Sequence, residues 1–416
     1  PRNHLVTKAA NDGTPGSLLF ALAHASNNDV ITFALPEYPS VIRVPEAYGP
    51  LVLSTALTLK GPGADLLTIS GDGDGDGDSD GQIFVVQSRV TIEGLTLSQG
   101  HATFGGAVSV AQEGALTLRS CAVVDSEADE YGGGIDVEGS LLLENCYLAR
   151  NRVTATGFGG GAVAFFTSHD SSIVNTTFAS NRVDNSGGYG GGAVYVERDD
   201  VPINVAVTHC TFAGNADASG RASAVYVVGG NSFATLKNTI FSDFSAQAGA
   251  RNIDVTGDGW VVSQGGNVCD DTTRTAHQQS GGTSVYLLTH TGDKTAVMPG
   301  LGGLTQAKGD VTPTYPLTPG SPANHWAQSS GVITDQRARI RRSEPRDSGA
   351  VQQNASERVA ITEIQLSAEE GDTDQFIELF VPRDGQAVNL SGCSLFVNGV
   401  AVHQFGLGSL ALTNSV

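Results

Sequence analysis

The sequence is poor in residues that a typical cytosolic enzyme uses freely, with one methionine, two tryptophans and only 16% charged residues. Basic residues are also scarce. The chain has 23 Lys and Arg against 43 Asp and Glu, which gives a formal charge of −20. A surface this acidic repels nucleic acid and anionic membranes and favours cations. The composition therefore argues against a nucleic-acid partner.

Long apolar runs are missing as well. No run approaches the length that a transmembrane helix needs, so we expect no membrane insertion. The chain carries no signal peptide and opens on Pro1, which suggests a mature or trimmed product.

Cysteine is infrequent, and the spacing of the cysteines does not match a metal-binding motif. The five cysteines form neither a C-x-x-C motif nor a Cys/His pattern with zinc spacing, which argues against a zinc or redox site. Cys121, Cys146 and Cys210 recur at one position of a repeat, where cysteine behaves as a small buried hydrophobe. We favour buried free thiols, while a disulfide between Cys121 and Cys146 stays open.

Glycine is abundant, with 53 residues, and it organises the repeat. Glycine-rich turns lead into short apolar runs whose aligned Val or Ile positions lie 27 to 31 residues apart, at Val108, Ile135, Val163, Val194 and Val225. A second phrase recurs between them as Ser120-Cys121, Asn145-Cys146, Asn175-Thr176, His209-Cys210 and Asn238-Thr239. An Asn follows three of these phrases, as Asn151, Asn181 and Asn215. A period of this length indicates stacked structural units.

Short strands fill each unit. Runs such as 114–119 and 140–144 have alternating or continuous apolar character, and the repeats show no convincing helical period. Three such strands per repeat predict an all-β fold, a right-handed parallel β-helix in which each coil pairs with the next. Equivalent side chains would then form ladders, with the Cys/Thr series inside and the Asn series at a corner. Glycines at one corner would supply a bend with positive φ.

Four segments follow from this pattern. Residues 1–44 are predicted to be an N-terminal cap with one short helix around residues 18–22, and residues 45–300 the β-helix. Residues 301–352 are predicted to be a C-terminal cap, because open parallel edges invite association. After a polar linker, residues 353–416 change to longer alternating strands, which suggest a partial immunoglobulin-like β-sandwich.

The sequences of several segments resemble those of a known group of proteins. Gly13-Thr-Pro-Gly-Ser-Leu, the run from Leu57 to Gly71 and the Gly-Gly-Gly coils are similar to bacterial extracellular β-helix proteins, related in style to polymorphic outer-membrane proteins. Residues 312–323, Thr334-Asp-Gln-Arg337 and Asp347-Ser-Gly-Ala350 resemble the closing signature of that group, of the choice-of-anchor type. Asn324-His-Trp and Ala338 depart from that signature. Strands within 359–395 resemble the opening of a lamin-tail domain. The resemblance implies an extracellular or cell-surface location.

The sharpest chemical feature is an alternating Asp-Gly run. It places oxygen ligands at every second position, with glycines that allow tight turning, as Ca²⁺ sites require. Ile83, Val85 and Gln87 stand where an EF-hand-like loop would need its closing Glu. The candidate calcium ligands are Asp72, Asp74, Asp76, Asp78 and Asp80. A solvated acidic loop without a metal is the open alternative.

Catalytic motifs are harder to find. Polysaccharide enzymes with this fold need convergent carboxylates beside an Arg or His. The adjacent pairs Asp199-Asp200 and Asp270-Asp271 lack the Asn-Thr-Asp and Gly-His-Gly settings of polygalacturonases. A basic cluster could receive an anionic polymer, although an ion-paired cap is the favoured interpretation; it comprises Arg337, Arg339, Arg341, Arg342 and Arg346.

These observations lead to two functional hypotheses. The first is a non-catalytic extracellular structural or adhesive surface protein, with the β-helix as a rigid rod. Its partners would be copies of itself, joined end to end or by strand donation in a filament, a surface polysaccharide, or another cell-surface protein. The second is a polysaccharide lyase or glycoside hydrolase that uses a lateral groove of the helix.

Overall fold

The computed structural model describes residues 1–353 except for 155–156, 168, 188–189, 199–200, 243–250, 258, 272–276, 279–283, 286, 308 and 342–344. Strands at 277–278 and 284–285 and six strands beyond residue 353 are described by their backbone alone. Among the described residues, no helix is both long enough and apolar enough to cross a membrane.

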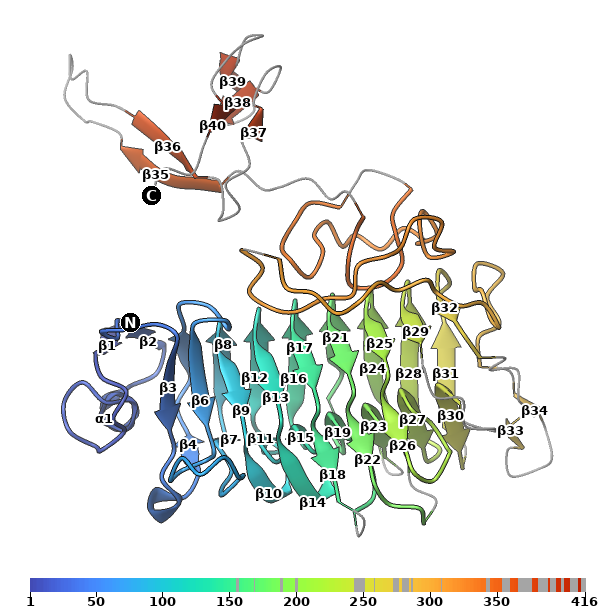
Figure 1. The fold of residues 1–416 in the computed structure, drawn as a ribbon, viewed down its shortest axis with the longest axis horizontal. Helices are drawn as coiled ribbons and strands as arrows, with labels where there is room; N and C mark the ends of the chain where they lie inside the picture. Colours follow the sequence, from blue (N-terminus) through green and yellow to red (C-terminus); the bar gives the residue numbers. More distant parts are fainter. Residues whose placement is uncertain are drawn as a thin grey trace.

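Three long parallel sheets and one shorter sheet form the body of the molecule (Figure 1). Sheet A has ten strands: β1 (Asn3–Val6), β2 (Asp29–Phe33), β5 (Leu57–Lys60), β8 (Arg89–Glu93), β12 (Ala115–Arg119), β16 (Ser140–Glu144), β20 (Ser171–Val174), β24 (Ile203–Thr208), β28 (Ser232–Lys237) and β31 (Trp260–Ser263). Sheet B has nine: β3 (Ser40–Arg43), β6 (Leu67–Ser70), β9 (Thr96–Ser98), β13 (Ala122–Val124), β17 (Tyr147–Ala149), β21 (Thr177–Ala179), β25 (Thr211–Ala213), β29 (Ile240–Ser242) and β32 (Val268–Cys269).

Sheets C and D complete the coils. Sheet C has eight strands: β4 (Leu51–Leu53), β7 (Phe84–Val86), β11 (Val108–Val110), β15 (Ile135–Val137), β19 (Val163–Phe165), β23 (Val194–Glu197), β27 (Val225–Val228) and β30 (Ile253–Thr256). Sheet D has five: β10 (His101–Phe104), β14 (Glu127–Tyr131), β18 (Arg152–Val153), β22 (Arg182–Val183) and β26 (Ala216–Asp217). Each strand pairs with the strand one coil before and one coil after it, so the chain forms a parallel β-helix, as predicted.

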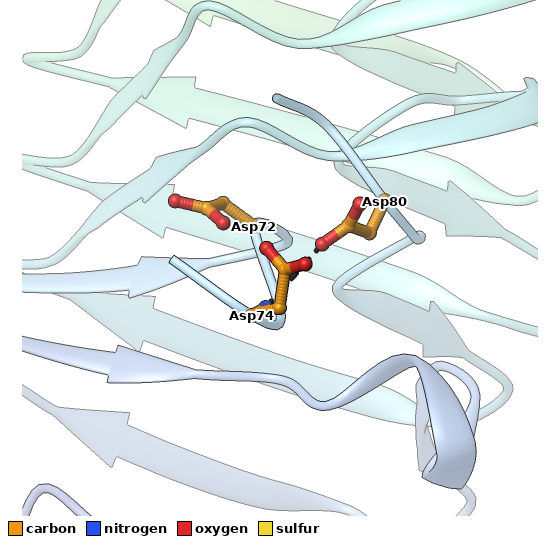
Figure 2. A group of neighbouring side chains, drawn as sticks. All are labelled: Asp72, Asp74 and Asp80. Carbon is orange, nitrogen blue, oxygen red and sulfur yellow. Dashed lines mark hydrogen bonds between the residues drawn. The ribbon is translucent and has the colours of Figure 1, made fainter. Parts of the chain in front are cut away.

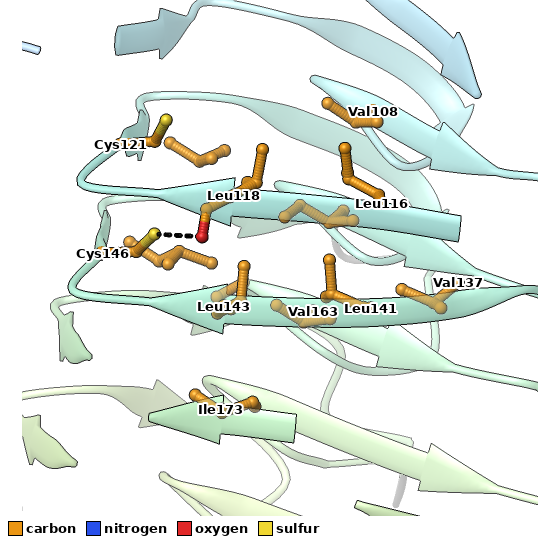
Figure 3. Packing of buried hydrophobic residues seen from close by; sticks show 14 of the residues in the cluster. Val108, Leu116, Leu118, Cys121, Val137, Leu141, Leu143, Cys146, Val163 and Ile173 are labelled. Carbon is orange, nitrogen blue, oxygen red and sulfur yellow. Dashed lines mark hydrogen bonds between the residues drawn. The ribbon is translucent and has the colours of Figure 1, made fainter. Parts of the chain in front are cut away.

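Alternation within the strands explains which side chains face inward. In β12, Leu116 and Leu118 are buried whereas Thr117 between them points outward. The register places Leu116 beside Leu141 and Leu118 beside Leu143 on the next coil, and Figure 3 shows these side chains stacked in the interior. Buried apolar ladders of this kind supply the main stabilisation of the fold.

Left-handed backbone turns separate the sheets at matching positions. The residue before each member of the Cys/Thr ladder has positive φ, at Ser120, Asn145, Asn175, His209 and Asn238. At the glycine corner Gly132 has φ +63°, and a Cβ added to Gly133 would lie 2.4 Å from the carbonyl oxygen of Gly161. The positive φ of Gly132 confirms the predicted role of the corner glycines, and the coils also approach too closely there for a side chain.

The asparagine ladder also lies where the sequence placed it. Asn151 Nδ2 donates to Asn181 Oδ1 at 3.0 Å, and Asn181 Nδ2 donates to Asn215 Oδ1 at 2.9 Å. The same oxygens accept the backbone N–H groups of Asn151 and Asn181. These amides therefore satisfy polar groups of a buried corner that water cannot reach.

The cysteines of the ladder are buried and free. Cys121 and Cys146 make no disulfide, and Cys146 Sγ lies 3.3 Å from the carbonyl oxygen of Leu118 (Figure 3). Burial raises the pKa of Cys121 to about 12, which keeps the thiol protonated and unreactive. Cys210 and Cys269 are likewise buried and free, whereas Cys393 lies outside the described residues.

The N-terminal segment begins the coils as well as covering them. Helix α1 (Leu18–His24) starts at Ser17, whose Oγ accepts the N–H of Phe20, and it buries Leu18 and Ala21 against the core. Strands β1, β2 and β3 of the expected cap already pair within sheets A and B. A short 3₁₀ turn, η1 (Glu46–Tyr48), precedes β4.

The described residues of 312–353, called the strap below, lie along the outer face of sheet B above β17, β21, β25 and β29 (Figure 1). The sequence predicted a cap for residues 301–352 at the end of the helix. The outer face of sheet B explains the difference, because it presents Tyr147 and Ile240, which the strap buries beneath Tyr315 and Leu317.

The remaining strands pair antiparallel. They are β33 (His277–Gln278), β34 (Ser284–Val285), β35 (Ala360–Gln365), β36 (Phe376–Phe380), β37 (Val388–Asn389), β38 (Ser394–Val397), β39 (Val400–Gln404) and β40 (Ala411–Leu412). The pairs are β33 with β34, β35 with β36, β37 with β40 and β38 with β39. Assembly of the last six strands into an immunoglobulin-like sandwich stays a prediction.

Replacing Val163 by Asp tests the inward register. Val163 is completely buried in the core cluster, so an unpaired carboxylate there should lower the free energy of unfolding by about 3 kcal/mol or more. Thr117→Asp, on the outward face of β12, is the matched control and should cost much less. Denaturant unfolding of both variants makes the measurement, and equal losses would contradict the assigned faces.

Candidate functional site

The Asp-Gly loop connects β6 to β7 and gathers three of its five aspartates. Ligand atoms of Asp72, Asp74 and Asp80 all lie within 4.8 Å of one another (Figure 2). Three carboxylates this close provide the oxygen donors that Ca²⁺ prefers, and their mutual repulsion favours a cation.

The loop's own backbone positions these carboxylates. Asp80 Oδ2 accepts the N–H of Gly73 at 2.8 Å, and Asp72 Oδ1 accepts the N–H of Gly75 at 2.7 Å. Asp72 is only 2% exposed, and its other oxygen lies 3.0 Å from Nη1 of Arg43. Because Arg43 already balances one carboxylate, a metal would compete with this ion pair.

The other two predicted ligands lie apart from this group. Asp76 Oδ1 accepts the N–H of Asp78 in a tight turn of the exposed loop tip. The structure thus brings together Asp72, Asp74 and Asp80 but leaves Asp76 and Asp78 at the tip. Calcium binding stays a prediction. If the ion binds, three of the five aspartates are placed to be its ligands.

A lateral groove of about 650 Å³ runs beside the loop over the outer face of sheet B. Gln99 Nε2 donates to the carbonyl oxygen of Gly77 and so fixes the loop tip to the groove wall. His101 also lines the groove, and its Nε2 lies 3.2 Å from Oδ1 of Asp129. The groove is therefore polar, with Asp78, Asp125 and Glu127 among its lining residues.

Ion pairs between coils border this groove. Arg150 contacts both oxygens of Asp125 at 2.7 Å, and Arg152 bridges Glu127 and Asp184. These side chains are about half-exposed, so each pair contributes little to stability on its own. Their effect is to tie successive coils together along one edge of the rod.

The remaining sequence candidates have structural partners. Asp270 Oδ1 accepts Nδ2 of Asn252 at 2.7 Å, and Asp271 Oδ2 accepts the N–H of the same residue. This pair holds a turn near the end of the coils and does not face the groove residues. Asp199 and Asp200 lie outside the described residues.

The arginine cluster belongs to the strap. Arg337 pairs with Asp335 at 2.5 Å, and Arg339 pairs with Asp310 at 3.0 Å. Arg346 Nη1 donates to the carbonyl oxygen of Val332. Arg342 lies outside the described residues. The described members of the cluster agree with an ion-paired structural segment.

Arg341 fastens the strap to the β-helix. Its side chain is 2% exposed and donates to the carbonyl oxygens of Thr334, Asp347 and Gly349 and, at 2.9 Å, to Asn175 Oδ1. Burial lowers the pKa of Arg341 to about 10, which leaves the guanidinium charged at neutral pH. One buried cation thus joins the strap to the corner before β21.

A second candidate site, around Asp136, has no counterpart among the motifs of the sequence. This residue occupies the outward position of β15, yet it is only 6% exposed, and its Oδ1 has no hydrogen-bond partner. Burial, and then repulsion by Glu138, raise the pKa of Asp136 to about 7. The carboxyl lines a pocket of about 360 Å³ together with Gln82, Phe104 and Ser109.

The one signal in the sequence for this site is a single Asp within a short apolar strand. Ile135-Asp136-Val137 resembles Val108-Ser109-Val110, so the sequence alone suggested an ordinary exposed residue. Asp136 takes the outward position of β15 by spacing, and no periodic signal in the sequence indicates that this position is only 6% exposed. Perturbed carboxyls in pockets often mark functional sites.

Comparison with known proteins agrees with this fold. Residues 81–267 match a family model described as a right handed beta helix region. The match spans the regular coils, and this part of the chain folds as an all-β, right-handed parallel β-helix. Bacterial origin, the outer-membrane and anchor resemblances and the lamin-tail domain stay predictions.

Two further comparisons add little about function. No curated protein matches the chain. The crystal structure of pectate lyase Pel9A aligns with a TM-score of 0.37 and 12% sequence identity, covering 85% of this chain and 97% of that chain. A likeness this weak carries no argument about activity.

Calcium titration should give a measurable heat with a dissociation constant on the order of 10⁻⁴–10⁻³ M. Asp74→Asn and Asp80→Asn should each remove the signal, whereas Asp78→Asn should preserve it because Asp78 lies outside the cluster. Chelation should increase proteolytic cleavage within residues 72–80 while the coils stay folded. Absence of heat in the unmodified protein would reject the calcium hypothesis.

Asp136 should make stability depend on pH. Its pKa is higher in the folded state than in the unfolded chain, so the folded state holds the proton more tightly. Stability should therefore fall as pH rises from about 4 through 7. Asp136→Asn removes this loss and should stabilise the protein by about 4 kcal/mol at pH 8 and by less at pH 5. Chemical denaturation at both pH values measures the difference, and an equal gain at both would contradict the assignment.

Proposed function

We propose that this protein is a non-catalytic extracellular structural or adhesive protein whose β-helix acts as a rigid rod. The proposal rests on the observation that neighbouring coils are held together both from inside and from outside the β-helix. Buried amides of Asn151, Asn181 and Asn215 join neighbouring coils from within. The strap joins β17 to β29 from outside and is anchored by Arg341.

This arrangement suits a mechanical role. The strap crosses several coils, so bending or separating those coils would break its contacts with Thr177, Thr211 and Asn238 at once. Rows of ion pairs across coils oppose the same motion on the groove side. An acidic, polar exterior on a stiff body supports solubility and the display of surfaces at a distance.

A polysaccharide lyase or glycoside hydrolase is the second candidate, and Asp136 is the observation that favours it. A carboxyl that keeps its proton near neutral pH can act as a general acid on a glycosidic oxygen. Glu138 is the other acidic residue that lines the same pocket. Hydrolysis would need a second carboxylate at a suitable separation across the scissile bond.

Self-association belongs to the same proposal. A head-to-tail contact, through the ends of the rod or through strand donation by the C-terminal strands, would be heterologous and would build a filament. A surface polysaccharide or another cell-surface protein is the alternative partner. Light scattering on concentrated protein distinguishes these cases, because a monodisperse monomer would reject the filament.

A combined retention and cleavage assay tests the proposed function. The purified protein is applied to immobilised acidic and neutral polysaccharides, and both bound protein and released sugar are measured. We expect retention on at least one surface without new reducing ends or unsaturated products. Release that increases with time, and that Asp136→Asn abolishes, would establish the enzymatic alternative instead.

A further inference from the structure

The pocket at Asp136 lies where the cross-section of the coils changes. Sheet D begins with β10, so the coil that contains Phe104 has four strands whereas the coil before it contributes only to sheets A, B and C. Phe104 stacks on Tyr131 of the following coil. Among the described residues, no aromatic ring of the preceding coil stacks on Phe104. The step leaves an open space of about 360 Å³ beside β10.

Phe104 is the aromatic residue that lines this space, and it ends a stack of rings. Phe104, Tyr131 and Phe158 come from successive coils and form a continuous stack, with ring centroids 6.2 Å and 4.8 Å apart and interplanar angles of 15° and 10°. Phe104 ends the stack and is 45% exposed, although its neighbours are partly buried. The stack thus supports a flat apolar surface that borders the pocket.

Polar residues, among them Gln82, Ser109 and Asp136, line the same pocket. Asp136 Oδ1 is buried and lacks a partner, which is costly unless something else supplies a hydrogen bond. Gln82 Nε2 donates to the carbonyl oxygens of Phe104 and Gly105, at 2.8 Å and 2.6 Å, and this fixes its amide. Its Oε1 accepts a long hydrogen bond from Ser109 Oγ at 3.4 Å. Several hydrogen-bonding groups therefore converge beside the aromatic surface.

We propose that this pocket binds one ring of a neutral sugar, with the ring face against Phe104 and a hydroxyl group against the Asp136 carboxyl. A sugar ring carries apolar C–H groups on its faces and hydroxyls around its edge, which matches an aromatic ring and polar groups that line one pocket. The volume lies at the small end of ligand pockets and suits one or two rings. This inference goes beyond the scaffold role and does not depend on it.

The protonated carboxyl explains the preference for a neutral ligand. In its acid form Asp136 donates through O–H and accepts through the other oxygen, so it can serve a hydroxyl in either direction. Glu138 supplies the one acidic neighbour that raises its pKa, and the flanking strands place uncharged Ser109 and Ala164 beside it. A divalent cation is the competing ligand, but it would leave the exposed face of Phe104 without a role.

A glycan array followed by calorimetry tests the proposal on the full chain. The array presents neutral gluco-, xylo-, manno- and galacto-oligosaccharides and acidic glycans, and soluble forms of any hit are titrated. We expect a neutral oligosaccharide to bind, and Phe104→Ala to weaken it tenfold or more. Tyr48→Ala, which removes another exposed ring outside the pocket, is the matched control and should leave affinity unchanged.

The pH profile separates recognition by Asp136 from a structural effect. Affinity of the unmodified protein should fall at least tenfold between pH 6 and pH 9, since the carboxyl then loses its donated proton. Asp136→Asn keeps a donor and an acceptor, so its affinity should stay constant over the same range, while Asp136→Leu should abolish binding. Folding of each variant is checked by circular dichroism.

The outcomes distinguish this proposal from the scaffold role. Absence of neutral-glycan binding, binding that Phe104→Ala leaves intact, or a calcium signal that Asp136→Asn removes would overturn the sugar pocket. None of these results bears on the rod. Cleavage of a bound oligosaccharide would support the pocket and overturn the non-catalytic role.

Discussion

Parallel pairing between coils is the constraint on which the rest of the structure depends. Each residue lies beside its counterpart one coil away, as Leu118 does beside Leu143, so a favourable side chain at one position is reinforced by its neighbours. The same rule makes an unfavourable side chain more damaging, because one charge at an inward ladder position would disturb the packing of both adjacent coils. Ladders of Leu, Val, Phe, Cys and Asn follow from this single requirement.

The sequence predicted what this local rule determines. The spacing of Cys121, Asn151 and Gly132 located an inward ladder, an amide corner and a glycine corner, and all three are present. It could not predict the path of the strap, because the contact between Arg341 and Asn175 joins residues 166 positions apart without any periodic signal. Asp136 is a related case, since its spacing places it on the outward face of β15 and only the folded structure shows that it is buried.

The regular coils and the two candidate sites occupy different parts of this molecule. The repeating coils bury nearly all their ladder positions, whereas both candidate sites lie where the repeat is interrupted. The acidic cluster occupies the loop between β6 and β7, and the Asp136 pocket lies where sheet D begins. The stacked coils provide the stability that offsets a costly group such as the unpartnered Asp136 carboxyl, which stands in register between Ser109 and Ala164.

Hydrogen exchange in an Arg341→Met variant tests most directly whether the strap stiffens the coils. We predict that amides of β21 and β25 and of the strap exchange faster together, because the anchor at Asn175 is lost. Amides of β5, β8 and β12, which the strap does not cross, should keep their protection. Unchanged exchange in β21 and β25, or an equal loss of protection along the whole helix, would contradict the account of a laterally strapped rod.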